Sequence, residues 1–389
     1  MKKVLAQVIA TALLGSLSII PATAAVKAGA TCSKAGSTNN SGGKKFTCVK
    51  SGKKLVWNKG VAVTKPAVAP SPSPSNATEP IKEIVPAMPT SFEDLAKNYK
   101  GIPLAVWADV RKRMSSTNVK TEFKVSTGPA TIQPAEKPII QTLLSRASSI
   151  YSDFAQPAVT NVYYFNHEDI AWAQTQHRSL QQPKFKESDL AGNCRSDSDC
   201  GAFGSTSQGV GAMFMGVHLK NLDPIEIYGG TEVHEFTHVV QYALYSSQVS
   251  NNPNRFLPGW FMEGQASAVQ VASGTKDYED YLKARKKWFM HPSGSLTNYS
   301  ESEILRFLDL QGVGKFDGAT WSHVYDIGCF ATETMIAIGG VASTLELIKE
   351  ISTGTSFEAA FEEIYKTSWD KAKVAIADAV AAEYRDSRS

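Results

Sequence analysis

The segment GGTEVHEFTHVVQYAL, residues 229–244, constrains the fold and the chemistry of this chain more than any other stretch. Its apolar residues recur at helical spacing, and residues 227–245 together predict one long, buried helix. His234 and His238 lie four positions apart, so on a helix both rings stand on one face and can reach one metal ion. In a chain with only seven histidines, this H-E-x-x-H pattern indicates a zinc site rather than two surface histidines on an amphipathic helix.

A catalytic zinc needs three protein ligands, and a later segment, LPGWFMEGQASAVQVA, offers the third. Glu263 stands there between apolar and small residues, where a carboxylate is costly to bury unless it is paired or bound to metal. We therefore expect His234, His238 and Glu263 to hold Zn²⁺. A salt-bridged Glu263 on a helix surface is the alternative. We also expect the small residues Gly264 and Ala266 to let this second helix pack closely against the first.

These residues, together with Trp260–Gly264, resemble the active site of the gluzincin zinc metallopeptidases, in which a glutamate on a second helix completes a His₂Glu site. The W-x-x-E-G-x-A pattern is similar to that of families related to thermolysin and to the M1 aminopeptidases, and the resemblance covers about residues 140–370. It implies hydrolysis of peptide bonds by zinc-activated water, with Glu235 as the general base. Two alternatives remain: a catalytically inactive cell-envelope binding protein on the same fold, and a zinc hydrolase that acts on a non-peptide bond.

The same resemblance assigns two supporting roles. In M1 enzymes a tyrosine in a Y-x-x-G context stabilises the oxyanion, and Tyr325 begins such a pattern here. Thermolysin-like enzymes use a histidine, so His323 is the rival; on a helix only one of the two side chains can reach the site, and we favour Tyr325. Ser267 stands where thermolysin has an aspartate that supports a ligand, which leaves Glu232 and Asp326 as candidates to orient the histidines.

The resemblance extends to a predicted strand upstream of the histidines, within residues 209–219. Its central residues are Gly211, Ala212, Met213, Phe214 and Met215. They resemble the G-A-M-E-N strand of M1 aminopeptidases, which pairs with the substrate backbone, so we expect them to form the edge strand of the cleft. Phe214 replaces the glutamate that binds a free substrate amine, and this departure favours an endopeptidase over an aminopeptidase.

The N-terminus, MKKVLAQVIATALLGSLSIIPATAA, has the lysines, the apolar run and the small-residue end of a secretory signal peptide, residues 1–25. A membrane anchor would need a longer apolar span. No later run approaches about 20 consecutive apolar residues, so we expect no membrane span after signal cleavage. The protein is therefore expected to be secreted or held at the cell surface.

Five cysteines fit this extracytoplasmic compartment. Cys32 lies close to Cys48 in the sequence, and Cys194 lies close to Cys200, so each pair predicts a local disulfide. Cys329 is left over within an apolar helical run, where a buried free thiol is expected.

Residues 26–60 predict a small module in which two short strands flank a turn at Ser51-Gly52 and a disulfide takes the place of a core. The module is similar to the Cys-paired modules at the N-termini of secreted actinobacterial proteins. Its lysines are Lys44, Lys45, Lys50, Lys53, Lys54 and Lys59. They suggest attachment to an anionic cell-envelope polymer, although a solvated basic surface is the interpretation we favour from the sequence. A Pro/Ser-rich linker, residues 61–90, follows the module.

Residues 91–389 predict one metallopeptidase domain of α+β class. Strand candidates at residues 160–165 and 209–219 precede the histidine helix, and nearly everything after residue 255 has helical character. This order predicts an N-terminal mixed sheet followed by a mostly helical C-terminal half. The net charge of +3 and the absence of a recognisable nucleic-acid motif argue against nucleic acid as a partner. The resemblance to zinc metallopeptidases implies a peptide or protein substrate.

Overall fold

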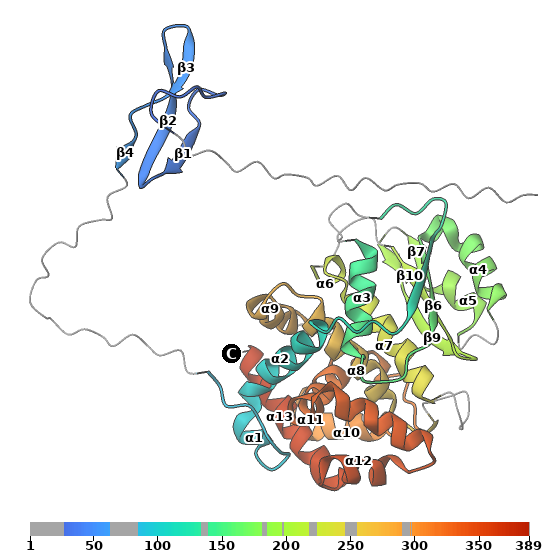
Figure 1. Ribbon diagram of the computed structural model, residues 1–389. Coiled ribbons are helices and arrows are strands. Elements are labelled where there is room, and N and C mark those ends of the chain that lie inside the picture. The colour runs from blue at the N-terminus through green and yellow to red at the C-terminus, as the bar shows by residue number, and fades with distance from the viewer. Residues whose placement is uncertain are drawn as a thin grey trace, which may run out of the picture. The chain divides into compact units, whose positions relative to one another are not determined.

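The computed structural model describes residues 27–62, 85–133, 139–180, 185–196, 198–217, 224–245, 255–289, 296 and 298–388. The predicted signal peptide and most of the predicted linker lie outside these residues. The chain divides into two compact units, Met1–Lys82 and Glu83–Ser389, and each is described by itself (Figure 1).

The first unit is a small antiparallel sheet. Its strands are β1 (Thr38–Ser41), β2 (Lys44–Ser51), β3 (Lys54–Trp57) and β4 (Val61–Ala62). The turn between β2 and β3 lies at Gly52-Lys53, one residue later than expected, because Ser51 still belongs to β2 and pairs with Lys54. A disulfide joins Cys32 to Cys48, as the sequence predicted. Phe46 and Cys48 are the buried apolar residues of this unit among those described, so the disulfide replaces a core that the chain is too short to build.

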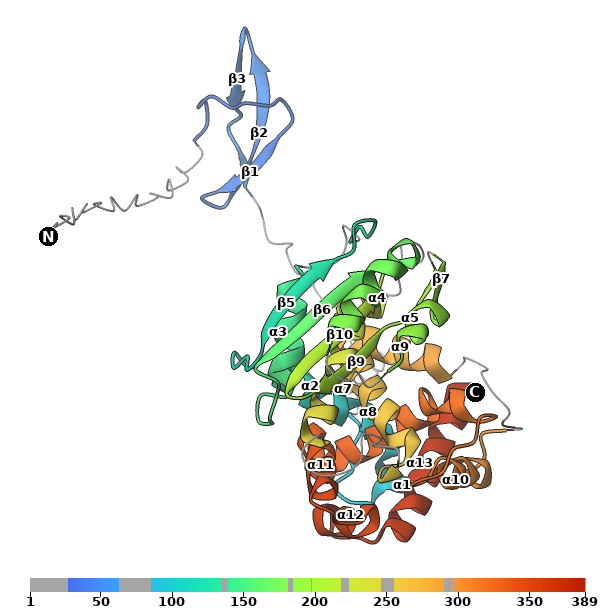
Figure 2. The same ribbon diagram turned by 90° about the vertical axis from the view of Figure 1, so that its right-hand side faces the viewer.

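The second unit contains a mixed four-stranded sheet. Its strands are β5 (Glu122–Thr127), β6 (Val159–Phe165), β9 (Phe203–Ser207) and β10 (Val210–Gly216), in the order β5-β6-β10-β9. β5, β6 and β10 run parallel, and β9 is an antiparallel edge. Helices α4 (Ile170–Ser179) and α5 (Glu187–Gly192) lie on one face of this sheet (Figure 2). The long helices of the C-terminal half follow the sheet in the chain, so the α+β prediction is confirmed.

The expected position of residues 211–215 at the edge of the cleft is corrected by this pairing. β10 has a partner on both sides, so its backbone is not free to pair with a substrate, and β9 forms the edge. Alternation along β10 also turns Phe214 toward Tyr163 and the α4/α5 face, with the two ring centroids 4.8 Å apart. The apolar run of β10 is that of an interior strand, and pairing partners are not visible in a sequence.

Three long helices carry the centre of the second unit: α7 (Gly230–Tyr245), α8 (Gly259–Ser273) and α11 (Ile327–Ser352). The helix expected over residues 227–245 is α7, which begins three residues later than predicted. The short helix α6 (Pro224–Ile227) is separate from it, because it ends before Gly229, whose φ of 85° is left-handed. The other helices that the structure describes with printed bounds are α1 (Leu95–Asn98), α2 (Ile102–Met114), α3 (Ile140–Ile150), α9 (Tyr278–Phe289), α10 (Glu301–Leu310), α12 (Phe357–Tyr365) and α13 (Trp369–Arg388).

α8 is the buried helix between α7 and α11. Gly264 makes its close contact with α11 rather than with α7, because a Cβ placed on it would lie 2.2 Å from the carbonyl oxygen of Gly328. The expectation that Gly264 serves the contact with the first helix is therefore wrong. Packing of α8 against both neighbours still fixes the direction in which Glu263 points.

α11 is broken in the middle. Gly340 has a φ of 74°, and the carboxylate of Asp109 on α2 accepts a hydrogen bond of 2.8 Å from the backbone N–H of Val341, which begins the second half. Among the described residues, Trp321–Ser352 is one helical stretch long and apolar enough to cross a membrane. However, 67% of its most apolar window is buried inside the unit, as in a core helix.

Candidate metal centre

His234, His238 and Glu263, the metal triad, converge from α7 and α8. The Nε2 atoms of the two histidines lie 3.2 Å apart, and the Oε2 atom of Glu263 lies 3.4 Å from each of them. Ligands bound at about 2.0–2.1 Å to one tetrahedral ion lie about 3.3–3.4 Å from one another. The three donor atoms therefore already stand at the spacing that a small tetrahedral cation requires.

The electrostatics of the triad also suit a cation. Burial by itself would lower the pKa of His238, yet the neighbouring Glu263 raises that pKa to about 9. Burial would raise the pKa of Glu263, but His238 and His234 hold it far below its usual range. Each partner thus favours the charged form of the other, and a bound cation would supply the same attraction to an ionised Glu263 and neutral imidazoles.

A chain of buried amides orients His238. Its Nδ1 lies 2.8 Å from Oε1 of Gln241, whose Nε2 donates to the backbone oxygen of Met262 and to Oε1 of Gln265. Because both donor hydrogens of Gln241 are engaged, its oxygen must face His238 and accept a hydrogen bond from Nδ1–H. This fixes the tautomer that leaves the Nε2 lone pair free for a metal.

The chain continues into α11. Nε2 of Gln265 donates a hydrogen bond of 2.6 Å to the hydroxyl of Thr344, which donates in turn to the backbone oxygen of Val341 at 2.7 Å. Gln241, Gln265 and Thr344 are all fully buried. The orientation of His238 is therefore tied to the start of the second half of α11, immediately after the break at Gly340.

His234 has an equivalent partner on α8. Its Nδ1 lies 2.8 Å from Oε1 of Gln270, so a proton on Nδ1 again leaves Nε2 for a metal. The expected orienting roles of Glu232 and Asp326 are wrong, because Glu232 accepts a hydrogen bond from Tyr164 and Asp326 pairs with His323. Gln270 lies seven residues beyond Glu263, about two helical turns along the same face, and this spacing could have revealed it.

Glu235 lies beside the triad and against the edge strand. The backbone N–H of Gly204 on β9 donates a hydrogen bond to its carboxylate, while burial raises its pKa and the two histidines oppose that rise. A Cβ on Gly204 would lie 1.9 Å from the backbone oxygen of Glu235, so only glycine permits this approach of β9 to α7. Because that N–H points to Glu235, the side of β9 that faces away from β10 is directed toward the triad, and this side has no strand partner among the described residues.

Tyr325 and His323 lie in different environments. The ring of Tyr325 stacks near that of His234 with centroids 6.5 Å apart, and Glu263, burial and Glu235 together raise the pKa of its phenol, which keeps it protonated. His323, in a 3₁₀ turn at Trp321–Val324, is buried between Tyr299 and Phe307, and its Nδ1 lies 3.1 Å from Asp326. The structure thus brings Tyr325 to the triad and holds His323 away from it.

Two cavities meet at His234, Glu235 and Tyr325. One, of about 410 Å³, is bordered by the whole triad and by Gly204 of β9. The other, of about 240 Å³, extends toward the carboxyl end of β10. Together they give the triad access from outside, and their sizes suit side chains or short peptide segments.

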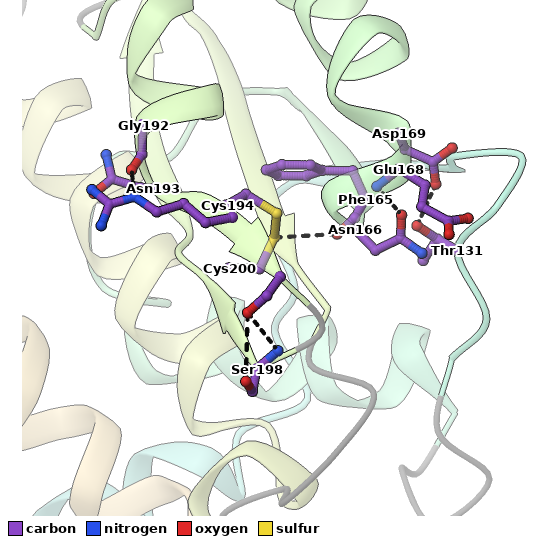
Figure 3. The surroundings of a disulfide bond; sticks show 12 residues. Thr131, Phe165, Asn166, Glu168, Asp169, Gly192, Asn193, Cys194, Ser198 and Cys200 are labelled. Carbon is purple, nitrogen blue, oxygen red and sulfur yellow. Dashed lines mark hydrogen bonds between the residues drawn. A yellow bond between two sulfur atoms is a disulfide. The ribbon is translucent and has the colours of Figure 1, made fainter.

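A disulfide between Cys194 and Cys200 lies at the entrance to the edge strand (Figure 3). The Cys200 sulfur lies 3.8 Å from the backbone oxygen of Phe165, and Cys200 and Gly201 both border the smaller cavity. The N–H of Gly201 donates to the backbone oxygen of Asn193 at 2.6 Å. This predicted disulfide therefore anchors the segment that leads into β9, whereas Cys329 is a buried free thiol, as expected.

The chain matches no family model, no curated protein and no solved structure. The family resemblance therefore depends on the residues of the site and on their geometry.

Proposed function

We propose that this protein is an extracytoplasmic zinc peptidase of gluzincin type, most simply an endopeptidase. The observation that carries the proposal is the triad, whose donor atoms stand at tetrahedral spacing with Glu235 and Tyr325 beside them and two cavities in front. Two disulfides in the described part of the chain support an oxidising, extracytoplasmic compartment, and the predicted signal peptide would direct export.

Metal binding falls to His234, His238 and Glu263. Zinc fits this set because two neutral imidazoles and one carboxylate are the ligands of many catalytic zinc sites. When bound there, zinc supplies a Lewis acid for a carbonyl oxygen and lowers the pKa of a coordinated water. Gln241 and Gln270 present both imidazoles in the tautomer that binding requires.

The reaction steps fall to other side chains. Glu235, held by the N–H of Gly204, accepts a proton from the attacking water and passes it to the leaving amine. The protonated phenol of Tyr325 donates a hydrogen bond to the oxyanion that develops on the substrate carbonyl. The free edge of β9 pairs with the substrate backbone, which places the scissile bond in front of Glu235.

The test combines metal content with cleavage of casein and of a peptide mixture. It uses purified residues 26–389, the variant Glu235→Gln, and Glu279→Gln as a matched change at an exposed glutamate on α9. We expect one zinc per chain in all three proteins, and cleavage by the parent and by Glu279→Gln alone. Loss of Glu235 should reduce the rate by at least about 100-fold, the usual contribution of a general base.

Other outcomes separate the alternatives. Zinc in all three proteins without cleavage by any would move the function to a non-peptide bond or to an inactive binding protein. Absence of zinc from the parent would rule out the metal centre. Equal cleavage by the parent and Glu235→Gln would remove Glu235 from the reaction.

A further inference from the structure

The two units of the chain carry opposite charge. Residues 27–62 contain eight lysines and no arginine, aspartate or glutamate, a net charge of +8. Residues 83–389 contain 28 basic and 36 acidic residues, a net charge of −8. The overall charge of +3 therefore conceals a dense basic module joined to an acidic unit, and such asymmetry marks a segment with its own partner.

All eight ammonium groups of the module are available to a ligand. Each lysine is exposed: Lys27, Lys34, Lys44, Lys45, Lys50, Lys53, Lys54 and Lys59. No carboxylate lies within the module, and among the described residues none of the eight side chains forms an ion pair. Repulsion among them lowers the stability of so small a fold, which depends on one disulfide.

The positions of the lysines distinguish between polyanions of different shape. Along β2, Lys44 and Lys50 point to one face of the sheet and Lys45 to the other, because side chains alternate along a strand. Lys53 and Lys54 lie at the opposite end of the hairpin from Lys44. Positive charge thus surrounds the module, which suits a flexible chain that wraps it better than a flat membrane that meets one face.

The apolar surface of the module agrees with this distinction. Its exposed large apolar side chains are Val49, which is 39% exposed, and Val61, which is 69% exposed. Binding at a lipid surface by a small fold normally adds inserted aromatic or leucine side chains to the electrostatic attraction. Two separate valines do not provide such an anchor.

We propose that the N-terminal module binds a phosphate-rich anionic polymer of the cell envelope and so retains the acidic second unit at the cell surface. The attraction is between the eight lysines and repeated phosphate groups, and it needs no defined pocket. This inference does not depend on the catalytic activity of the second unit.

The test measures binding of residues 26–389 to long-chain inorganic polyphosphate at low salt. In the module variant, Lys44, Lys45, Lys50 and Lys54 are changed to glutamine. The control variant carries the same loss of charge at four exposed lysines of the second unit: Lys112, Lys276, Lys315 and Lys371. We expect the module variant to bind at least about tenfold more weakly, since each lysine near a polyanion contributes separately, and the control variant to bind as the parent does.

Three further arms complete the design. A Lys→Arg version of the module variant should restore binding, and alkylation with mass spectrometry should show an intact Cys32–Cys48 disulfide in every variant. Binding should vanish at about 1 M salt, where the screening length is only about 3 Å. Equal loss in module and control variants would overturn the proposal, as would tighter binding to single-stranded DNA or to vesicles of equimolar phosphatidylglycerol and phosphatidylcholine than to polyphosphate.

Discussion

The second unit buries two clusters of ionisable side chains, and they differ in what completes them. In the metal triad, two imidazoles and one carboxylate converge beside open cavities, and the described residues that border these cavities include no lysine or arginine. In the second cluster, Arg285 of α9 lies between Glu333 of α11 and Glu383 of α13, with its Nη2 atom 2.5 Å from each carboxylate. Tyr281 also donates a hydrogen bond of 2.6 Å to Glu333.

The comparison separates a binding site from a structural link. The arginine cluster supplies its own counter-charge and joins three helices, so it is complete as the chain folds. The triad gathers donor atoms that lie 3.2–3.4 Å apart, and among the described residues no lysine or arginine forms an ion pair with Glu263. Burial and perturbed pKa values occur in both clusters, so these properties alone do not identify a site. The decisive difference is whether the chain itself supplies the positive charge.

The largest expected effect is on the free energy of unfolding, when the arginine is removed from the arginine cluster. Arg285→Met should lower the free energy of unfolding by about 3–5 kcal/mol, because it leaves Glu333 and Glu383 buried without a cation. Urea unfolding with and without a chelator measures this. Arg306→Met, which removes an exposed pair with Glu303, is the control and should cost at most about 1 kcal/mol. Similar losses in the two variants would mean that the buried cluster does not link the helices.

Substitution of a triad ligand should change stability less than the loss of Arg285 does, but it should strongly weaken metal binding. Glu263→Gln keeps the shape and removes the anionic ligand, so zinc affinity should fall by at least about 100-fold, more than the loss of an outer partner causes. Competition with a chromogenic chelator measures the affinity. The matched change Glu333→Gln should leave zinc affinity intact. If both glutamine variants bound zinc as the parent does, Glu263 would not be a ligand.

Substitutions in the amide chain that orients His238 should have the next largest effect on zinc affinity. Gln241→Met should lower zinc affinity by about 10–100-fold, because His238 loses the acceptor that fixes its tautomer. Gln265→Met removes the next hydrogen bond of the chain, between Gln265 and Gln241, and should lower zinc affinity by a smaller factor. Ser267→Ala is the control on the same helix, since this buried hydroxyl has no hydrogen-bond partner among the described residues. An unchanged affinity in Gln241→Met would show that packing alone orients His238.

The smallest effect is the pH dependence of the arginine cluster. Burial raises the pKa of Glu383 to about 7, while Arg285 opposes the rise and Glu333 and Asp386 add to it. The folded chain therefore holds a proton that the unfolded chain loses above its ordinary pKa of 4.5. The resulting stability is fully present below pH 4.5 and is lost as the pH rises toward 7. The melting temperature of the parent should therefore fall over this range, and it should fall less in Glu383→Gln. Each kcal/mol of lost stability corresponds to about 2–4 °C in melting temperature. A parent and variant with parallel profiles would contradict this assignment.

Several features of this protein follow from the sequence because they depend on neighbours along the chain. The i, i+4 spacing of His234 and His238 places both rings on one helical face wherever that helix packs. The two disulfides join cysteines that are close in sequence. The hairpin around Gly52 is a local pattern as well, and so is the order of strands before helices, which yields the α+β class.

Other features were decided only by the tertiary structure. β9 rather than β10 is the edge strand, because pairing joins segments whose order in the sheet no local pattern encodes. Gln241 and Gln270 rather than Glu232 and Asp326 orient the histidines. Sequence pattern names a residue that can ligate or donate, whereas its partner is set by packing between helices that are distant in the chain. For that physical reason the three residues of the triad were predictable, and the arrangement of the groups that support them was not.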